Sequence, residues 1–245
     1  MLDPPLRTNG ARAPLWGPGA TIGWSALIAL TFVSLQFAVL FAFAAAGYVV
    51  DSAEHDGTLI ACASLVTGIV CTALIVGIVK LKRGSSVADY LRLKPVSAGT
   101  LLKWLAVTFA LIAIADFITV STGRPVVPEF MQQAYATADP PWLFWIALVF
   151  AAPLFEEMFF RGFLFSGLAS SALRPAGAIV VTAAVWAVIH LQYDAYEVGL
   201  IFCLGLVLGA ARLATGSLVA PLVMHATMNF VATVQAALLV AQRSA

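Results

Sequence analysis

The stretch "APLFEEMFFRGFLF", residues 151–164, places two glutamates and an arginine inside an otherwise apolar run. The chain around it is 62% hydrophobic and only 10% charged, with a mean hydropathy of +0.98. Such a composition lies far outside the range of soluble globular domains. Apolar runs of about 18 residues or more can cross a bilayer as helices, and they recur along most of the chain. We therefore predict an all-α, polytopic membrane helix bundle.

The hydropathy pattern predicts about seven transmembrane helices. Residues 1–20 are rich in Pro, Gly and Ala and are expected to form a cytoplasmic N-terminal tail, whereas residues 21–245 are expected to form one transmembrane domain. The expected spans are residues 21–50, 58–79, 101–120, about 140–170, 176–191, 196–213 and 217–241.

Most of the 13 lysines and arginines fall on one side of this topology. The positive-inside rule assigns that side to the cytoplasm, so we expect a multi-pass protein of the plasma membrane with a cytoplasmic N-terminus. The net charge is only +1 and no basic patch is present, which argues against a nucleic-acid partner. The residues on the predicted inner side are Arg7, Arg12, Lys80, Lys82, Arg83, Arg92, Lys94, Lys103, Arg174 and Arg212.

The charged residues of the opening stretch must be accommodated inside a membrane helix. An unpaired ionisable residue at the helix centre costs about 2.5 to 3.5 kcal/mol on insertion scales. Glu157 and Arg161 have the i, i+4 spacing and the acid-first order that favour an ion pair. Glu156 points about 100° away and cannot share that face. We therefore expect a structural Glu157 paired with Arg161, and a reactive Glu156.

Two histidines lie within expected spans. If the fourth and fifth spans form a hairpin around Leu173, Glu156 and His190 are equally far from the turn and lie at the same depth. His225 and Asn229 are four residues apart and share one helix face. Because intramembrane polar groups of this kind mark functional sites, we expect these residues to converge on one cavity.

Each polar residue also has a packing interpretation. A single intramembrane His or Asn often joins helices without doing chemistry, and Trp186, one turn before His190, is expected to pack. Pro153 and Pro221 each free a backbone carbonyl, which favours a hydrated cavity beside them. The set as a whole favours a functional site over packing.

The combination resembles the CPBP intramembrane proteases, which include the Rce1-type CAAX prenyl endopeptidases and the bacterial Abi proteins. The similarity covers about residues 140–235, the expected catalytic core. It rests on "EEMFFR" at 156–161 and "HATMN" at 225–229. Between them stands "WAVIH" at 186–190, where the family usually has Phe in place of Trp186.

The resemblance implies an intramembrane glutamic endopeptidase that acts on a membrane-associated protein or peptide in the lipid bilayer. Glu156 and His190 match the pair that activates water, Glu157 belongs to the same motif, and His225 and Asn229 match the oxyanion-stabilising pair. The chemistry agrees, because a buried carboxylate can act as a general base and His or Asn N–H groups can stabilise an oxyanion.

Other functions remain open at this stage. Two histidines and a glutamate could instead bind zinc, but the chain has no HExxH motif and Cys62, Cys71 and Cys203 have no metal-ligand spacing. We therefore favour a mechanism without metal or other cofactor. An ion-coupled transporter would use buried Glu and His as relay groups, and a membrane scaffold would keep the fold without turnover.

Overall fold

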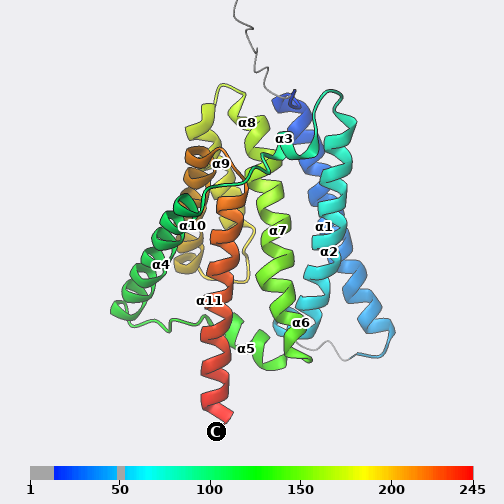
Figure 1. The fold of residues 1–245 in the computed structure, drawn as a ribbon. Coiled ribbons are helices and arrows are strands. Elements are labelled where there is room, and N and C mark those ends of the chain that lie inside the picture. The colour runs from blue at the N-terminus through cyan, green and yellow to red at the C-terminus, as the bar shows by residue number, and fades with distance from the viewer. Residues whose placement is uncertain (1–13, 49–52, 245) are drawn as a thin grey trace, which may run out of the picture.

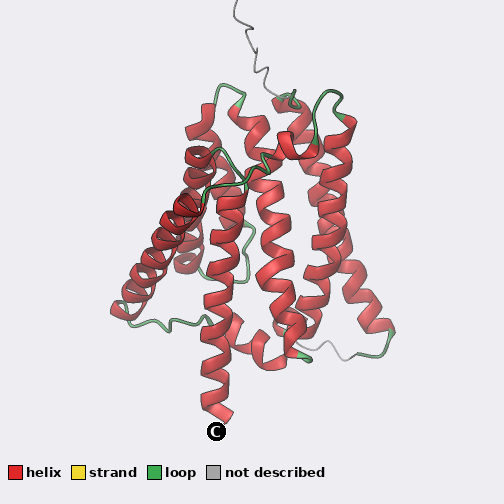
Figure 2. Cartoon of the chain, viewed as in Figure 1, coloured by secondary structure: helices red, strands yellow, loops and turns green. Residues whose placement is uncertain are grey.

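The computed structural model describes residues 14–48 and 53–244 as a bundle of helices (Figure 1). All regular secondary structure in these residues is helical (Figure 2), which confirms the predicted all-α class. Arg7 and Arg12 of the expected tail, and the end of the first expected span, lie outside the described residues. The α-helices are α1 (Pro18–Ala45), α2 (Gly57–Leu81), α3 (Val87–Leu91), α4 (Ala98–Ser121), α5 (Glu129–Thr137), α6 (Pro141–Ile146), α7 (Ala152–Glu156), α8 (Phe165–Ala169), α9 (Arg174–Val188), α10 (Ala195–Thr215) and α11 (Val219–Ser244).

Six helical stretches of the described chain are long and apolar enough to cross a membrane, which confirms the polytopic bundle. The exception among the expected spans is α9, which has 15 residues and ends at Val188 instead of residue 191. At 1.5 Å per residue it is about 22 Å long, less than the hydrocarbon core of about 30 Å. The six stretches are Pro18–Ala45, Gly57–Leu81, Ala98–Ser121, Pro141–Ala169, Ala195–Thr215 and Val219–Arg243.

The start of α10 is fixed by a capping box. The Asp194 side chain accepts a hydrogen bond from the Glu197 backbone N–H, and the Glu197 side chain accepts one from the Asp194 N–H. This capping box satisfies amide groups that the first helical turn leaves without partners. Arg124, just after α4, donates to the Asp194 carboxylate at 2.5 Å and holds the pKa of that carboxyl below its usual range. The connection from α9 therefore ends at a helix start that side-chain contacts hold in place.

One long helix, Pro141–Ala169, runs through the middle of the bundle, with α1 and α2 on one side and α9, α10 and α11 on the other (Figure 1). It consists of α6, α7 and α8 joined by two π-helical segments, Ala147–Ala151 and Glu157–Leu164. Every residue from Glu157 to Leu168 is buried. A helix segment that is buried on all sides lies in the core of its bundle, so Glu157 and Arg161 lie inside the protein and not against lipid, while Glu156 is partly exposed.

The packing of α2 against α5 requires a glycine. A Cβ atom added at Gly57 would lie 1.8 Å from the backbone oxygen of Ala134. We expect Gly57→Ala to force the two helices apart, because backbone cannot move aside as a side chain can, and to destabilise the protein by about 1 to 3 kcal/mol. Thermal unfolding of the purified protein in detergent measures this effect. Gly77→Ala on the same helix, with nothing within 4 Å of its added Cβ, is the matched control, and an equal loss in both variants would contradict the explanation.

Candidate functional site

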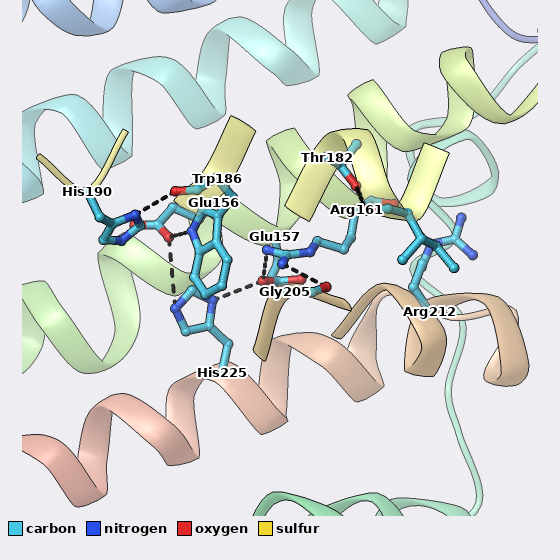
Figure 3. A network of polar contacts seen from close by, with 10 residues as sticks. Glu156, Glu157, Arg161, Thr182, Trp186, His190, Gly205, Arg212 and His225 are labelled. Carbon is cyan, nitrogen blue, oxygen red and sulfur yellow. Dashed lines mark hydrogen bonds and ion pairs between the residues drawn. The ribbon is translucent and has the colours of Figure 1, made fainter. Parts of the chain in front are cut away.

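The buried charges of the central helix form an ion pair (Figure 3). Glu157 and Arg161 are both fully buried, and Nη1 of Arg161 lies 2.8 Å from Oε1 of Glu157. Nη2 of Arg161 donates to the carbonyl oxygen of Gly205 on α10 at 3.3 Å. The guanidinium carbon lies 4.5 Å from the ring centre of Trp186 on α9, within the range of a cation–π contact. The pair has the predicted spacing and also connects the central helix to α9 and α10.

His225 on α11 links the two glutamates. Its side chain is buried, with Nδ1 2.9 Å from Oε1 of Glu157 and Nε2 3.9 Å from Oε2 of Glu156. An ionised carboxylate only accepts hydrogen bonds, so Nδ1 carries the hydrogen and donates it to Glu157. The Nε2 side of the ring therefore faces Glu156.

Glu156 lies in a different environment from its neighbour. Its side chain is 18% exposed, whereas that of Glu157 is 0% exposed. Oε2 of Glu156 accepts a hydrogen bond of 2.5 Å from the indole Nε1–H of Trp186. Within the described residues, no protein donor is bound to Oε1. The two adjacent carboxylates thus differ in environment: Glu157 is enclosed in an ion pair, and Glu156 is partly exposed with one oxygen that binds no described donor.

His190 lies just beyond the end of α9, in the connection to α10, and is half-buried. Its Nδ1 lies 2.6 Å from the backbone oxygen of Trp186. A carbonyl oxygen only accepts, so Nδ1 carries the hydrogen and Nε2 of the neutral ring keeps a free lone pair. Since Trp186 contacts Glu156 through its side chain and His190 through its backbone, it brings together the two residues that the sequence placed at one depth.

Asn229 on α11 is turned toward the backbone of the central helix. Its Nδ2 donates to the carbonyl oxygen of Leu148 at 2.8 Å. In the π-helical segment the N–H of Ala152 bonds to the carbonyl of Ala147, five residues back. In the same register the carbonyl of Leu148 would accept from the N–H of residue 153, but Pro153 has no N–H. The carbonyl that Pro153 leaves free is therefore bound by a side chain.

Trp186 is a site residue that the sequence interpretation assigned to packing alone. It is 3% exposed and packs edge-on against the ring of His225, with the ring centres 5.2 Å apart. Its indole N–H nevertheless binds Glu156. The sequence contained a signal for this contact, namely tryptophan at position 186 where the CPBP motif usually has phenylalanine. Tryptophan has a side-chain hydrogen-bond donor and phenylalanine has none.

Within the described residues, no three His, Cys, Asp or Glu side chains are grouped so that they could hold a metal ion. Nδ1 of His190 binds the Trp186 backbone oxygen and Nδ1 of His225 binds Glu157, which leaves one nitrogen on each ring.

Comparison with known families finds a match over the segment that carries these residues. Residues 138–231 match the family model described as type II CAAX prenyl endopeptidase Rce1-like. The match confirms the resemblance to the CPBP proteases and supports a CAAX-type peptidase that acts in the membrane. Helices α1 to α5 lie outside the matched segment. No curated protein and no solved structure matches the chain.

Loss of one member of the ion pair should destabilise the protein more than loss of both. Arg161→Ala leaves Glu157 as a buried carboxylate without its cation, which costs about 3 to 5 kcal/mol. Glu157→Gln combined with Arg161→Met removes both charges at similar volume, and the Gln carbonyl can still accept from His225. We expect more folded protein in membranes, and a higher unfolding temperature, for the double variant. An equal or lower yield of the double variant would argue against the ion-pair role.

Proposed function

We propose that this chain, whose Rce1-like segment confirms the CPBP resemblance, is a glutamic intramembrane endopeptidase that hydrolyses a peptide bond of a membrane-associated protein or peptide with activated water. The proposal is carried by one observation: Glu156, His190 and His225 all contact Trp186 or one another inside the bundle. In the described chain the carboxylate has one oxygen without a protein donor, Nε2 of His190 has no protein hydrogen bond, and Nε2 of His225 faces Glu156 at 3.9 Å. A base, a water-holding acceptor and an oxyanion donor are therefore available in one place.

Glu156 acts as the general base in this mechanism. Its Oε1 takes a proton from a water molecule, and the water oxygen attacks the carbonyl carbon of the peptide. The lone pair on Nε2 of His190 accepts the other hydrogen of that water and so holds it for attack. The partial exposure of the Glu156 side chain, 18%, supports access of water to the base.

The attack places negative charge on the peptide oxygen, which requires hydrogen-bond donors. Nδ1–H of His225 is already donated to Glu157, so His225 can donate to the oxyanion only from a protonated Nε2. The ring is then an imidazolium, with the carboxylates of Glu157 and Glu156 at 2.9 and 3.9 Å. Charges alternate from Arg161 through Glu157 and His225 to Glu156, and this balance lowers the free energy of burying them.

Asn229 supplies the second oxyanion donor in this proposal. Its amide nitrogen has two hydrogens, and Leu148 accepts one of them. When the intermediate collapses, protonated Glu156 gives its proton to the leaving nitrogen and the C–N bond breaks. The products are a new carboxylate and a new amine, and Glu156 returns to its starting state without a covalent intermediate.

The membrane location follows from the candidate spans and the protease family, and we propose further that the protein lies in the plasma membrane with its N-terminus in the cytoplasm. Basic residues at one end of the bundle support this orientation. Lys80 lies in the last turn of α2, Arg174 begins α9, and Arg212 lies in the last turn of α10. These helix ends lie at the same end of the bundle as the start of α1 (Figure 1).

Glu156→Gln should abolish cleavage without unfolding the protein. Gln keeps the shape and can still accept from Trp186, but it cannot take a proton from water. His190→Ala should be comparably damaging, because removal of either member of a catalytic unit costs nearly the whole effect. Asn229→Ala should lower kcat by about a hundredfold to a thousandfold, the value of one oxyanion donor.

The assay for these variants uses purified protein in detergent and a quenched fluorescent peptide that ends in a prenylated CAAX sequence, the substrate class in the family description. Unfolding temperatures are measured in parallel to separate lost chemistry from lost folding. Wild-type activity in Glu156→Gln would remove the proposed mechanism and favour a transporter or scaffold.

A strong zinc chelator should leave the cleavage rate unchanged, because the mechanism uses only side chains and water. The same assay is run before and after chelation and again after zinc is added back. Activity that is lost to the chelator and restored by zinc would make His190, His225 and a glutamate the metal ligands. That result would replace the metal-free mechanism.

A further inference from the structure

Trp186 contacts four side chains of the site, Glu156, Arg161, His190 and His225 (Figure 3). The Nε1–H donates to Oε2 of Glu156 at 2.5 Å. The Arg161 guanidinium lies 4.5 Å from the ring centre. The rings of His190 and His225 both meet the indole edge-on, with centres 5.2 Å away. A residue that only filled space would not require this combination of a donor, a cation contact and two imidazole contacts.

The indole hydrogen bond decides which oxygen of Glu156 is available to water. Oε2 is held by Trp186 and faces His225 at 3.9 Å, while Oε1 has no protein partner among the described residues. Without the indole donor, the carboxylate could rotate about its terminal bond, since that torsion is soft. Either oxygen, or neither, would then point at the water that is to be activated.

The position of the indole is in turn determined by the ion pair and by α10. Arg161 is held over the ring by its hydrogen bonds to Glu157 and to the Gly205 carbonyl. A Cβ atom added at Gly205 would lie 3.1 Å from Cε3 of Trp186 and 2.9 Å from Cβ of Ala183. Because residue 205 has no side chain, the α10 backbone packs directly on the indole. The ring is therefore confined between Arg161 and α10.

We propose that Trp186 is a positioning residue for the hydrolysis. Its N–H holds Oε2 of Glu156 so that Oε1 faces the water. Its ring contacts Arg161, so the position of the buried Glu157–Arg161 pair also determines the position of Glu156. The inference rests on the proposed function and adds a specific role for tryptophan at this position. Phenylalanine would keep an aromatic ring against Arg161 but would leave Oε2 without its donor.

The test replaces Trp186 with 3-benzothienylalanine, in which sulfur takes the place of the indole N–H and the two-ring shape is kept. A hydrogen bond to a charged group corresponds to about a tenfold to a hundredfold change in rate, and we expect kcat to fall by that factor. KM should stay within about twofold, because the substrate does not contact the lost hydrogen. The unfolding temperature should fall by only a few degrees, because packing is preserved and one hydrogen bond is lost.

Trp145 provides the matched control. Its Nε1–H donates to the hydroxyl of Tyr135 at 3.3 Å, away from the site, so the same replacement there should leave kcat unchanged. Trp186→Phe serves as a second variant if the benzothienyl protein does not fold, and it should show the same loss of kcat. A wild-type kcat in Trp186→Phe would contradict the proposed role of the indole N–H.

The outcomes separate the two proposals when Glu156→Gln is assayed beside these variants. An inactive Glu156→Gln with wild-type kcat in the benzothienyl protein overturns the positioning role and leaves the protease mechanism standing. A raised KM with unchanged kcat also overturns it, because Trp186 would then bind substrate and not orient the base. An active Glu156→Gln overturns the proposed function itself.

Discussion

The burial of Glu157 and Arg161 is the constraint on which the rest of the site depends. Removing two charges from water costs several kcal/mol per ion unless each is closely bound. Their ion pair at 2.8 Å satisfies this requirement only in part, since Nε of Arg161 and Oε2 of Glu157 have no protein partner in the described chain. The remaining contacts come from Gly205, Trp186 and His225, which lie on α10, α9 and α11. Satisfying one pair of charges therefore sets the positions of three helices.

Adjacent residues on one helix have separate tasks because a helix turns about 100° per residue. Glu157 points into the core and is fully enclosed, while Glu156 points to the edge of the core, where its side chain is 18% exposed. Glu156, the proposed base, is still linked to the enclosed carboxylate. His225 contacts both glutamates, and Trp186 contacts both Glu156 and Arg161. Stability and proposed chemistry are thus carried by one connected set of side chains.

Much of this arrangement could be predicted from the sequence, because hydropathy reports span positions and i, i+4 spacing reports helix faces. The Glu157–Arg161 pair and most span limits follow from these two patterns. The contacts of Asn229 and Trp186 do not, since they depend on which atoms of different helices meet. Asn229 binds Leu148 because a π-helical segment and Pro153 leave that carbonyl free. An i→i+5 register of this kind has no simple hydropathy pattern. The depth of Glu156 in the membrane was counted along an ideal α-helix, whereas the central helix contains two π-helical segments.

The early end of α9 places His190 in a non-helical connection beside the apolar bundle. Non-helical backbone at membrane depth is tolerated only where protein buries it or water reaches it. The connection after α9 carries His190, and Leu191, Gln192 and Asp194 within it are exposed. The connection is held at one end by the His190 contact with the Trp186 carbonyl and at the other by Arg124 on Asp194. A helix that continued to residue 191, as hydropathy predicted, would commit these backbone groups to helical hydrogen bonds. Because α9 stops at Val188, His190 lies outside the helix, where its Nδ1 binds the Trp186 carbonyl and not a helical partner.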